Sequence, residues 1–479
     1  MSNLKKKFLS GIFYTSIAKY TGLFISIGIT AVLARLLTPN DFGIIAIATV
    51  FINFFATLTT VGISPAIIQN KTIDKKDLIS INSFTALIAI IFTGIYLILV
   101  PLIAHFYTNE TLKDILFYLS INIFFSILST VPNALLLKDK RFKFIAIRTF
   151  TIQCVLGIIS IIAAYNGMGI YALTLSPIGS SILLFIISYK VYPIKFGKIE
   201  KNSISKILSF SILQMIFNFL YLGYRNIDKI LIGKYMGVGN LGYYEKSYRL
   251  MMLPLENVST IIAPVLHPLL SDYQKDYPYL WDVYKKMLAF LSEFSFIISV
   301  VLYYLAEVII LGLYGEQWIN AIPIFKILSL SICFQLLQAP IGAILQAANS
   351  VKTLVLCSIY VFIVMIICLF CAILLNDFNI VSYMIDIAFV IGFIIYQIFI
   401  CKIFKASISE LIKIVFPHFF YAIILFIILY AVNYWIKSNL WEGAIIVIMI
   451  TIIYYALLFH LNITKNTKQI LIEILKSKK

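Results

Sequence analysis

Charged residues are scarce in this chain, and acidic residues are the scarcest of them. Of the 479 residues only 12% are Asp, Glu, Lys or Arg, and Asp and Glu together number 21. A soluble globular domain carries roughly 25% charged residues. Hydrophobic residues instead make up 61% of the chain. The composition therefore excludes an ordinary soluble domain and predicts a protein that is solvated by lipid.

Residues that hold metals or act as nucleophiles are also few, and none of them stands in a recognisable motif. The chain has four histidines and six cysteines. Cys368 and Cys371 have the spacing of a redox motif, but they lie inside an apolar run with no His, Asp or Glu nearby in the sequence. We interpret the cysteines as small apolar residues of helices. The sequence predicts no catalytic residue, no metal site and no enzyme activity.

Apolar stretches long enough to cross a bilayer follow one another along nearly the whole chain. About 20 apolar residues span the hydrocarbon core as a helix, and in lipid only helices or closed barrels satisfy their own backbone groups. The apolar runs do not alternate with polar residues, which excludes barrel strands. We predict an all-α integral membrane protein with about fourteen transmembrane helices, at residues 10–34, 41–63, 80–104, 114–137, 147–165, 168–189, 209–233, 240–264, 287–312, 321–346, 353–375, 381–401, 411–435 and 441–461.

Basic residues gather in every second connection between these spans. Most of the 38 Lys and Arg residues fall on one side of the membrane if the chain crosses it fourteen times. That side receives both ends of the chain and, in one loop, the cluster Lys138, Lys140, Arg141, Lys143 and Arg148. Positive charge in short loops favours the cytoplasm, so we predict that both termini are cytoplasmic. The net charge of +17 is then a signal of topology, and no nucleic-acid partner is expected.

The two halves of the chain resemble each other in sequence. Ala34-Arg35-Leu36-Leu37 leads to Phe42-Gly43, and Gly233-Lys234-Tyr235-Met236 leads to Leu241-Gly242. The same spacing joins Pro65 to Pro264. A second pair of similar segments begins at Pro132 and at Pro340, at a slightly longer spacing.

An internal repeat of this kind predicts the domain organisation. The spacing spans six helices, an even number, so the repeats have parallel topology, as in many secondary transporters whose substrate path lies between the halves. We predict an N-terminal six-helix bundle at residues 1–206 and a C-terminal six-helix bundle at residues 207–405. Residues 406–479 then form two additional helices and a basic cytoplasmic tail.

Several sequence blocks, taken in their order and spacing, resemble a known family of transporters. The blocks are residues 32–43 (VLARLLTPNDFG), 62–69, 228–233, 241–244, 264–270 and 313–318 (LYGEQW). The chain resembles the polysaccharide flippases and exporters of the multidrug/oligosaccharidyl-lipid/polysaccharide (MOP) superfamily, and especially their colanic-acid-exporter-like (Wzx-type) branch. The resemblance covers most of the chain and thins after about residue 375.

The resemblance implies both a fold and an activity. Members of the family have two six-helix bundles in a pseudo-twofold V arrangement, with two extra C-terminal helices. They flip isoprenoid-diphosphate-linked oligosaccharide repeat units from the cytoplasmic to the outer leaflet of the cell (inner) membrane by alternating access, for surface polysaccharide, O-antigen or capsule export. The implied partners are the lipid-linked oligosaccharide, membrane lipids, and the polysaccharide polymerase and glycosyltransferases. No cofactor is expected, and coupling to H⁺ or Na⁺ stays open as the energy source. The chain has no Walker A loop, the motif that binds ATP.

Ionisable side chains inside the predicted spans are the candidate functional residues, because a charge in hydrocarbon is expensive. In the repeat arrangement, spans one, seven and eight line the same cleft. Cationic side chains in this cleft suit an anionic diphosphate head group, and acids there are candidates for ion coupling. The predicted substrate-binding residues are Lys19, Arg225, Lys229, Lys246 and Arg249. The predicted coupling residues are Glu256 as the deepest acid, followed by Asp228 and Asp386.

Structural roles stay open for these residues. Arg225 with Asp228, and Glu245 with Arg249, stand one helical turn apart and could equally be ion pairs that hold helices together. Glu256 could equally be a fixed counter-charge for Arg249. Aromatic residues near the charges could stack on sugar rings or belong to interfacial belts. These aromatic residues are Tyr221, Tyr224, Tyr243, Tyr244 and Tyr248.

Three other functions also stay open. A multidrug/cation antiporter of the same superfamily would prefer twelve spans and an acidic cavity. A membrane-embedded polysaccharide polymerase or glycosyltransferase would need a large outer loop or an acidic loop motif, and the predicted outer loops are short. A structural membrane subunit without transport would pack the polar faces of spans one, seven and eight without a cavity between them.

Overall fold

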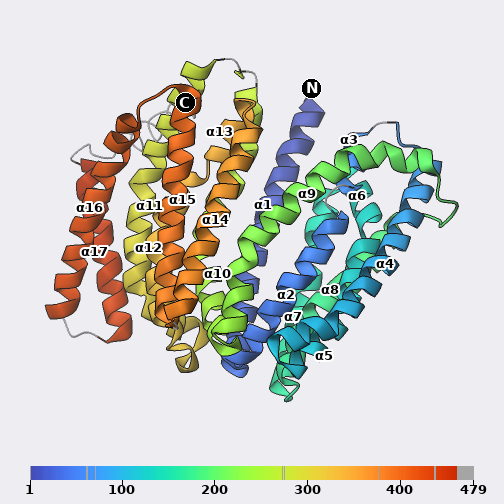
Figure 1. The fold of residues 1–479 in the computed structure, drawn as a ribbon, viewed down its shortest axis with the longest axis horizontal. Helices are drawn as coiled ribbons and strands as arrows, with labels where there is room; N and C mark the ends of the chain where they lie inside the picture. The colour runs from blue at the N-terminus through green and yellow to red at the C-terminus, as the bar shows by residue number, and fades with distance from the viewer. Residues whose placement is uncertain are drawn as a thin grey trace. The chain divides into compact units, whose positions relative to one another are not determined.

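The structure of this chain, a computed structural model, is helical throughout the part that it describes (Figure 1). The backbone is described for residues 2–60, 63–70, 72–271, 273–274, 276–375, 377–435 and 439–460. The side chains of residues 2–18, 57–60, 69, 206–221, 224, 259–269 and 271 are outside the description. Two compact units, Met1–Gly242 and Tyr243–Lys479, make up the chain.

The N-terminal unit is a bundle of long helices with two short ones. Its elements are α1 (Ser2–Leu36), α2 (Pro39–Thr60), α3 (Ile63–Gln69), α4 (Lys75–Tyr107), α5 (Glu110–Leu128), α6 (Thr130–Lys138), α7 (Phe142–Tyr165), the short helix η1 (Gly169–Tyr171), α8 (Ala172–Val191) and α9 (Lys201–Tyr235). Asp74 begins α4 with a capping box, in which its carboxylate accepts the N–H of Asp77 at 2.8 Å and its own N–H donates to Asp77 at 3.1 Å. Each bond satisfies a helix-end group that would otherwise lack a partner.

The C-terminal unit is a second bundle, in which α12 occupies the centre. Its elements are α10 (Val238–Ser271), whose first residues belong to the N-terminal unit, α11 (Tyr277–Tyr314), the short helix η2 (Glu316–Trp318), α12 (Ala321–Gln338), α13 (Ile341–Ala347), α14 (Val351–Leu375), α15 (Phe378–Phe404), α16 (Ile408–Trp435) and α17 (Leu440–His460). In an 18-residue apolar stretch of the span at Ala321–Ala347, 72% of the residues are buried, against 11% in a stretch of the span at Leu440–His460. Helix α12 is therefore enclosed by protein, whereas α17 presents most of its surface outward.

The prediction of an all-α membrane protein is confirmed. Twelve helical segments in the described residues are long and apolar enough to cross a membrane. Each predicted span coincides with a long helix or with a long and a short helix, but α9 and α10 are not among the twelve. Most of the ionisable residues that were predicted to be functional lie on these two helices. That α9 and α10 also cross the membrane, which would make fourteen crossings, therefore stays a prediction.

The outward faces of the helices are strongly apolar, as lipid requires. Phe370 and Leu374 on α14 are 61% and 70% exposed, and Ile427 on α16 and Ile445 on α17 are 59% and 62% exposed. A soluble monomer rarely exposes contiguous apolar patches larger than a few hundred Å². Exposing such faces to the hydrocarbon of a bilayer costs little free energy. The chain is therefore a multi-pass membrane protein.

Two predicted spans are interrupted at prolines. The span at residues 114–137 divides into α5 and α6 around Ser129, three residues before Pro132, and the span at residues 321–346 divides into α12 and α13 around Pro340. Proline has no backbone N–H to donate and clashes with the preceding turn, so it favours a break at this position. The two breaks occupy corresponding places in the two halves of the chain.

The turns that follow these two short helices have the same backbone conformation. Lys140 and Asn349 both adopt a left-handed conformation, with φ of 56° and 53°. The N–H groups of Lys140 and Arg141 donate back to the carbonyls of Leu137 and Leu136, and those of Asn349 and Ser350 donate to Gln346 and Leu345. The correspondence supports the internal repeat, with a spacing one residue longer than that between Pro132 and Pro340.

A close crossing of α2 and α10 also follows the repeat. A Cβ atom on Gly43 would lie 1.9 Å from the carbonyl oxygen of Val238, and a Cβ atom on Gly242 would lie 1.9 Å from that of Pro39. Gly43 corresponds to Gly242, and Pro39 to Val238, at the repeat spacing that joins Arg35 to Lys234. The two contacts are therefore equivalent, and glycine at both positions allows the two backbones to touch.

The connection between α8 and α9 is fixed along the start of α4. The N–H of Gly197 donates to Ser83 Oγ and that of Glu200 to Ser80 Oγ, both at 2.8 Å. Ser203 Oγ then donates to the buried Asp77 carboxylate at 2.7 Å. These bonds bring the first turn of α9 onto the N-terminal unit. The predicted boundary at residues 206–207 lies just beyond this contact, and the predicted division into three parts stays a prediction.

Candidate functional site

The predicted site residues of the N-terminal unit lie on α1 and α9. Lys19 on α1 is exposed, with its Nζ 5.9 Å from the centre of the Tyr20 ring. On α9, Asp228 is 5% exposed, while Arg225 and Lys229 are half-buried. Helix α9 packs on α2, α3 and α4, and the Tyr107 hydroxyl donates to the carbonyl of Ile230 at 3.2 Å. The charged turn of α9 is therefore held firmly within its unit.

Lys246 is the most buried cation among the predicted site residues. Its side chain on α10 is 4% exposed, and its Nζ lies 5.8 Å from the centre of the Tyr314 ring at the end of α11. Tyr314 in turn packs on Trp318, with ring centres 5.5 Å apart. The next residue, Ser247, donates to the carbonyl of Ala321 at 3.1 Å. A buried ammonium is costly, and the face of an aromatic ring compensates only part of that cost.

Two further charged residues of α10 surround the same tyrosine. Arg249 and Glu245 lie close enough to Lys246 and to Tyr314 to act on both electrostatically. Arg249 is exposed, so its guanidinium is available to a ligand. The structure thus brings Lys246, Arg249 and Glu245 together as one cluster. Glu256 lies further along α10 and is exposed, and its role in ion coupling stays a prediction.

Asp386 stands apart from that cluster, in a small polar region between α10, α12 and α15. Its Oδ1 atom is fully buried and accepts no hydrogen bond from the described residues, as is also true of Ser382 Oγ one turn before it. Ser331 of α12 is next to the Asp386 carboxyl group. Ser331 Oγ also lies 3.3 Å from Gln335 Nε2 and 3.8 Å from Met251 Sδ. A buried carboxyl group within a membrane span is a candidate for a functional role.

The predicted aromatic residues are mostly packed against protein. Tyr244 is fully buried and Tyr248 is 8% exposed, with ring centres 5.5 Å apart, and Tyr243 packs edge-on against Trp318 at 5.9 Å. Tyr244 and Tyr248 therefore contribute packing in this structure rather than an open face for a sugar ring. The side chains of Tyr221 and Tyr224 lie outside the described residues.

Arg148 is a buried cation, although the sequence predicted that it lies in a cytoplasmic loop. The structure places it inside α7, 8% exposed, where its Nη1 donates to Asn133 Oδ1 at 3.0 Å and to Ser188 Oγ. Its Nε has no acceptor among the described residues. The ring of Phe144 lies 6.0 Å from the guanidinium carbon. The partners come from α6 and α8, so no local pattern could reveal this cluster.

The predicted residues therefore fall into groups that belong to different units. Lys19, Arg225, Asp228 and Lys229 are in the N-terminal unit, and Lys246, Arg249, Glu256 and Asp386 are in the C-terminal unit. Their convergence on a common cleft is a relation between the units and stays a prediction. Within the described residues, no group of three His, Cys, Asp or Glu side chains is placed to hold a metal ion.

Comparison with known proteins places the chain among polysaccharide biosynthesis proteins. A family profile described as "Polysaccharide biosynthesis protein" matches residues 32–323. The teichuronic acid biosynthesis protein TuaB of Bacillus subtilis is 22% identical over 413 residues, which cover 85% of each chain. The lipopolysaccharide biosynthesis protein WzxC of Escherichia coli is 24% identical over 358 residues, which cover 72% of this chain and 71% of WzxC.

The fold has a counterpart among solved structures. The lipid II flippase MurJ in its inward closed conformation matches with a TM-score of 0.74 at 18% identity, over 92% of this chain and 97% of MurJ. The identity is too low to transfer a substrate, but the match confirms the expected fold. With a profile that covers more than half of its residues, this chain belongs to the polysaccharide biosynthesis protein family.

Proposed function

We propose that this membrane protein flips isoprenoid-diphosphate-linked oligosaccharide repeat units from the cytoplasmic to the outer leaflet by alternating access. The observation that carries the proposal is the family match over residues 32–323. The fold shared with a lipid II flippase supports it, as do relatives named for teichuronic acid and lipopolysaccharide biosynthesis. The process served is the export of surface polysaccharide, such as O-antigen, capsule or exopolysaccharide.

The cationic side chains would hold the diphosphate. Lys246 and Arg249 supply two positive charges within one turn of α10, and Arg225 and Lys229 supply two more on α9. Charge-assisted hydrogen bonds to phosphate oxygens are roughly twice as strong as neutral ones. Lys19 would add a further charge from α1. The exposed guanidinium of Arg249, beside the enclosed Lys246, is the position in the C-terminal unit that a diphosphate could reach first.

Ion coupling is proposed at Asp386, with Asp228 and Glu256 as the other acids. A coupling site needs a carboxyl group whose protonation or cation occupancy differs between two conformations. The buried Oδ1 of Asp386, beside Ser331 and Ser382, supports this choice. Coupling to H⁺ or Na⁺ would supply the driving force without a nucleotide.

Asp386→Asn should remove the ion dependence of transport while the protein stays folded, because Asn has nearly the same shape. The measurement is transport activity under an imposed pH gradient and under an imposed Na⁺ gradient. Asp377→Asn is the matched control, since Asp377 is an exposed cap at the start of the same helix. An Asp386→Asn variant with unchanged ion dependence would exclude this residue.

The proposed location is the cell (inner) membrane with both termini in the cytoplasm. The bias of Lys and Arg toward alternate connections supports this orientation. A polysaccharide polymerase and glycosyltransferases are the partners expected at the two faces, before and after flipping. The membrane-spanning helices and the family support a transporter rather than an enzyme, and no observation favours the polymerase or the multidrug/cation antiporter.

Deletion of the gene tests the proposal in the cell. We expect loss of the surface polysaccharide together with accumulation of the lipid-linked repeat unit, because synthesis on the cytoplasmic side continues while its product is trapped. Surface polysaccharide and extracted isoprenoid-diphosphate-linked sugar are the two quantities measured. A deletion strain that keeps its polysaccharide and accumulates no intermediate would contradict the proposal.

A further inference from the structure

An apolar groove opens on the surface of the C-terminal unit between α15 and α16. Its volume is about 480 Å³, and its floor is formed by Phe296 of α11 and Phe334 of α12. Its walls include Ile394 and Ile398 of α15 and Ile412 and Phe416 of α16, which are 46–59% exposed. A dry apolar cavity of about 150 Å³ already binds benzene. The groove is therefore large enough for a hydrocarbon chain.

The groove extends over the depth of one leaflet. Its lining on α16 runs from Ile408 to Phe419, which is about 16 Å at the helical rise of 1.5 Å per residue. The hydrocarbon core of a bilayer is about 30 Å thick, so the groove spans roughly half of it. One end lies at the start of α16, where the charge bias places the cytoplasm. The chain that fits it belongs to a lipid of the cytoplasmic leaflet.

One polar residue lines this otherwise apolar groove, but its polar atoms are covered by protein. Gln397 of α15 is 7% exposed, and its Oε1 accepts the Tyr284 hydroxyl at 2.6 Å. Its Nε2 is fully buried. The groove therefore presents an apolar surface to its occupant, which suits an acyl chain.

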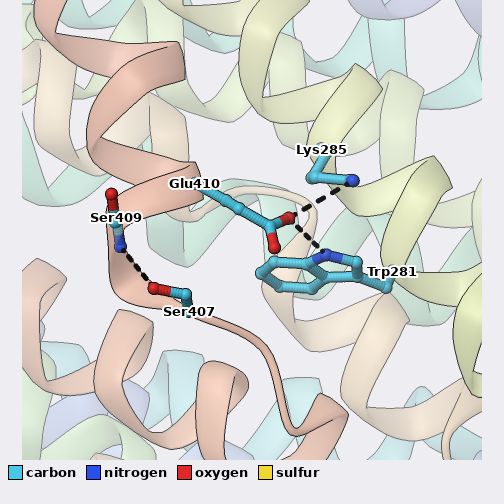
Figure 2. Close-up of polar contacts among 5 residues, drawn as sticks. All are labelled: Trp281, Lys285, Ser407, Ser409 and Glu410. Atoms are coloured by element: carbon cyan, nitrogen blue, oxygen red, sulfur yellow. Dashed lines mark hydrogen bonds and ion pairs between the residues drawn. The ribbon is translucent and has the colours of Figure 1, made fainter.

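The cytoplasmic end of the groove is positively charged. Figure 2 shows a carboxylate at this end, Glu410, held between Trp281 and Lys285, with Glu410 Oε2 at 3.1 Å from Trp281 Nε1 and 3.4 Å from Lys285 Nζ. Three exposed lysines lie on the two helices that form the groove, Lys402 and Lys405 at the end of α15 and Lys413 on α16. Lys413 is also close enough to Glu410 to act on its carboxylate electrostatically. Each lysine near a membrane surface attracts anionic lipid.

The spacing along α15 matches the order of groups in a phospholipid. Lys402 is one turn beyond Ile398, on the same face of the helix. An anionic phosphate beside Lys402 would therefore be followed by an acyl chain along Ile394, Ile412 and Phe416.

We propose that this groove is a binding site for one anionic diacyl phospholipid of the cytoplasmic leaflet. The lysines hold its head group, and the apolar walls hold an acyl chain. The site is separate from the proposed substrate residues and does not depend on what the protein transports. Its occupant would fill the space between α15 and α16 and fix the position of α16 against α15.

Native mass spectrometry of the full-length protein tests the site with phosphatidylglycerol and phosphatidylcholine as probes. We expect phosphatidylglycerol to bind roughly tenfold more tightly. Ile412→Trp fills the groove and should weaken phosphatidylglycerol binding at least tenfold. Ile427→Trp is the matched control, because Ile427 is equally exposed on α16 but does not line the groove. Equal binding of the two lipids, or equal effects of the two Trp variants, would overturn the proposal.

A further variant tests the head-group contacts. Replacing Lys402, Lys405 and Lys413 together by Gln should abolish the preference for phosphatidylglycerol over phosphatidylcholine. Isoprenyl phosphate is the control ligand. If Ile412→Trp weakens the binding of isoprenyl phosphate but not that of phosphatidylglycerol, the proposal is overturned in favour of an isoprenyl occupant.

Discussion

Lys246 and Arg148 are both buried cations, but their surroundings assign them different roles. Lys246 lies beside a ring face and two other charged residues, Glu245 and the exposed Arg249. Arg148 is held by an amide oxygen and a hydroxyl group and has no carboxylate partner among the described residues. The sequence predicted Lys246 because it interrupts a span. It could not predict Arg148, because Asn133 and Ser188 are distant in the chain and meet it only through packing.

Lys246→Met should lower polysaccharide export at least tenfold while the protein stays in the membrane. The physical reason is the loss of one charge from the cluster that would bind the diphosphate. Lys326→Met is the matched control, because Lys326 is also a lysine in a predicted span, with its Nζ 5.9 Å from the centre of the Tyr303 ring. Surface polysaccharide and membrane protein level are measured in the complemented deletion strain. Equal losses in the two variants would remove Lys246 from the site.

Asn133→Leu should destabilise the protein more than Arg148→Met. Loss of Asn133 leaves a buried guanidinium with one acceptor fewer, at a cost of about 2–3 kcal/mol. Arg148→Met removes the buried charge itself and leaves the bond between Ser188 Oγ and Asn133 Oδ1, 3.1 Å long, so the change should stay within about 1 kcal/mol. Thermal unfolding in detergent gives the comparison, and the reverse order would show that the guanidinium contributes more than its burial costs.

At the scale of single helices, the apolar runs predicted where the long helices lie, but not where they break. Pro132 and Pro340 were recognised as marks of a repeat, yet each also lies where a predicted span divides into a long and a short helix. The hydrophobicity of residues 114–137 and 321–346 continues through both breaks. For this reason the apolar pattern predicts one continuous span at each place. The shared left-handed turn at Lys140 and Asn349 likewise depends on backbone hydrogen bonds that no composition reveals.

Gly43→Ala and Gly242→Ala should each destabilise the fold by about 1–3 kcal/mol. In both cases the added methyl group would lie 1.9 Å from a carbonyl oxygen, so α2 and α10 must move apart. Gly239→Ala is the control in the same helix, with no atom within 4 Å of its Cβ, and should leave stability unchanged or slightly raised.

Because the two glycines share one crossing, the double variant Gly43→Ala/Gly242→Ala should cost less than the sum of the single variants. Thermal unfolding of the four proteins measures this. Single variants as stable as Gly239→Ala would mean that the crossing is not close in solution.

At the scale of the whole chain, the sequence predicted the fold class, the family and the repeat. The correspondence of Gly43 with Gly242 and of Lys140 with Asn349 supports the repeat independently of hydrophobicity. The packing of α9 could not be predicted, because it depends on contacts such as Ser203 with Asp77 and Tyr107 with Ile230, which join residues far apart in the chain. The groove between α15 and α16 was missed for the same reason.

The central claim is that this protein moves a lipid-linked oligosaccharide between leaflets, and the leaflet of the accumulated intermediate tests it most directly. The isoprenoid-diphosphate-linked repeat unit is labelled in the deletion strain and exposed to periodate, which does not cross the membrane. We expect the intermediate to be protected in the deletion strain and to become accessible when the wild-type gene is restored. An intermediate that is equally accessible with and without the protein would contradict flipping by this chain.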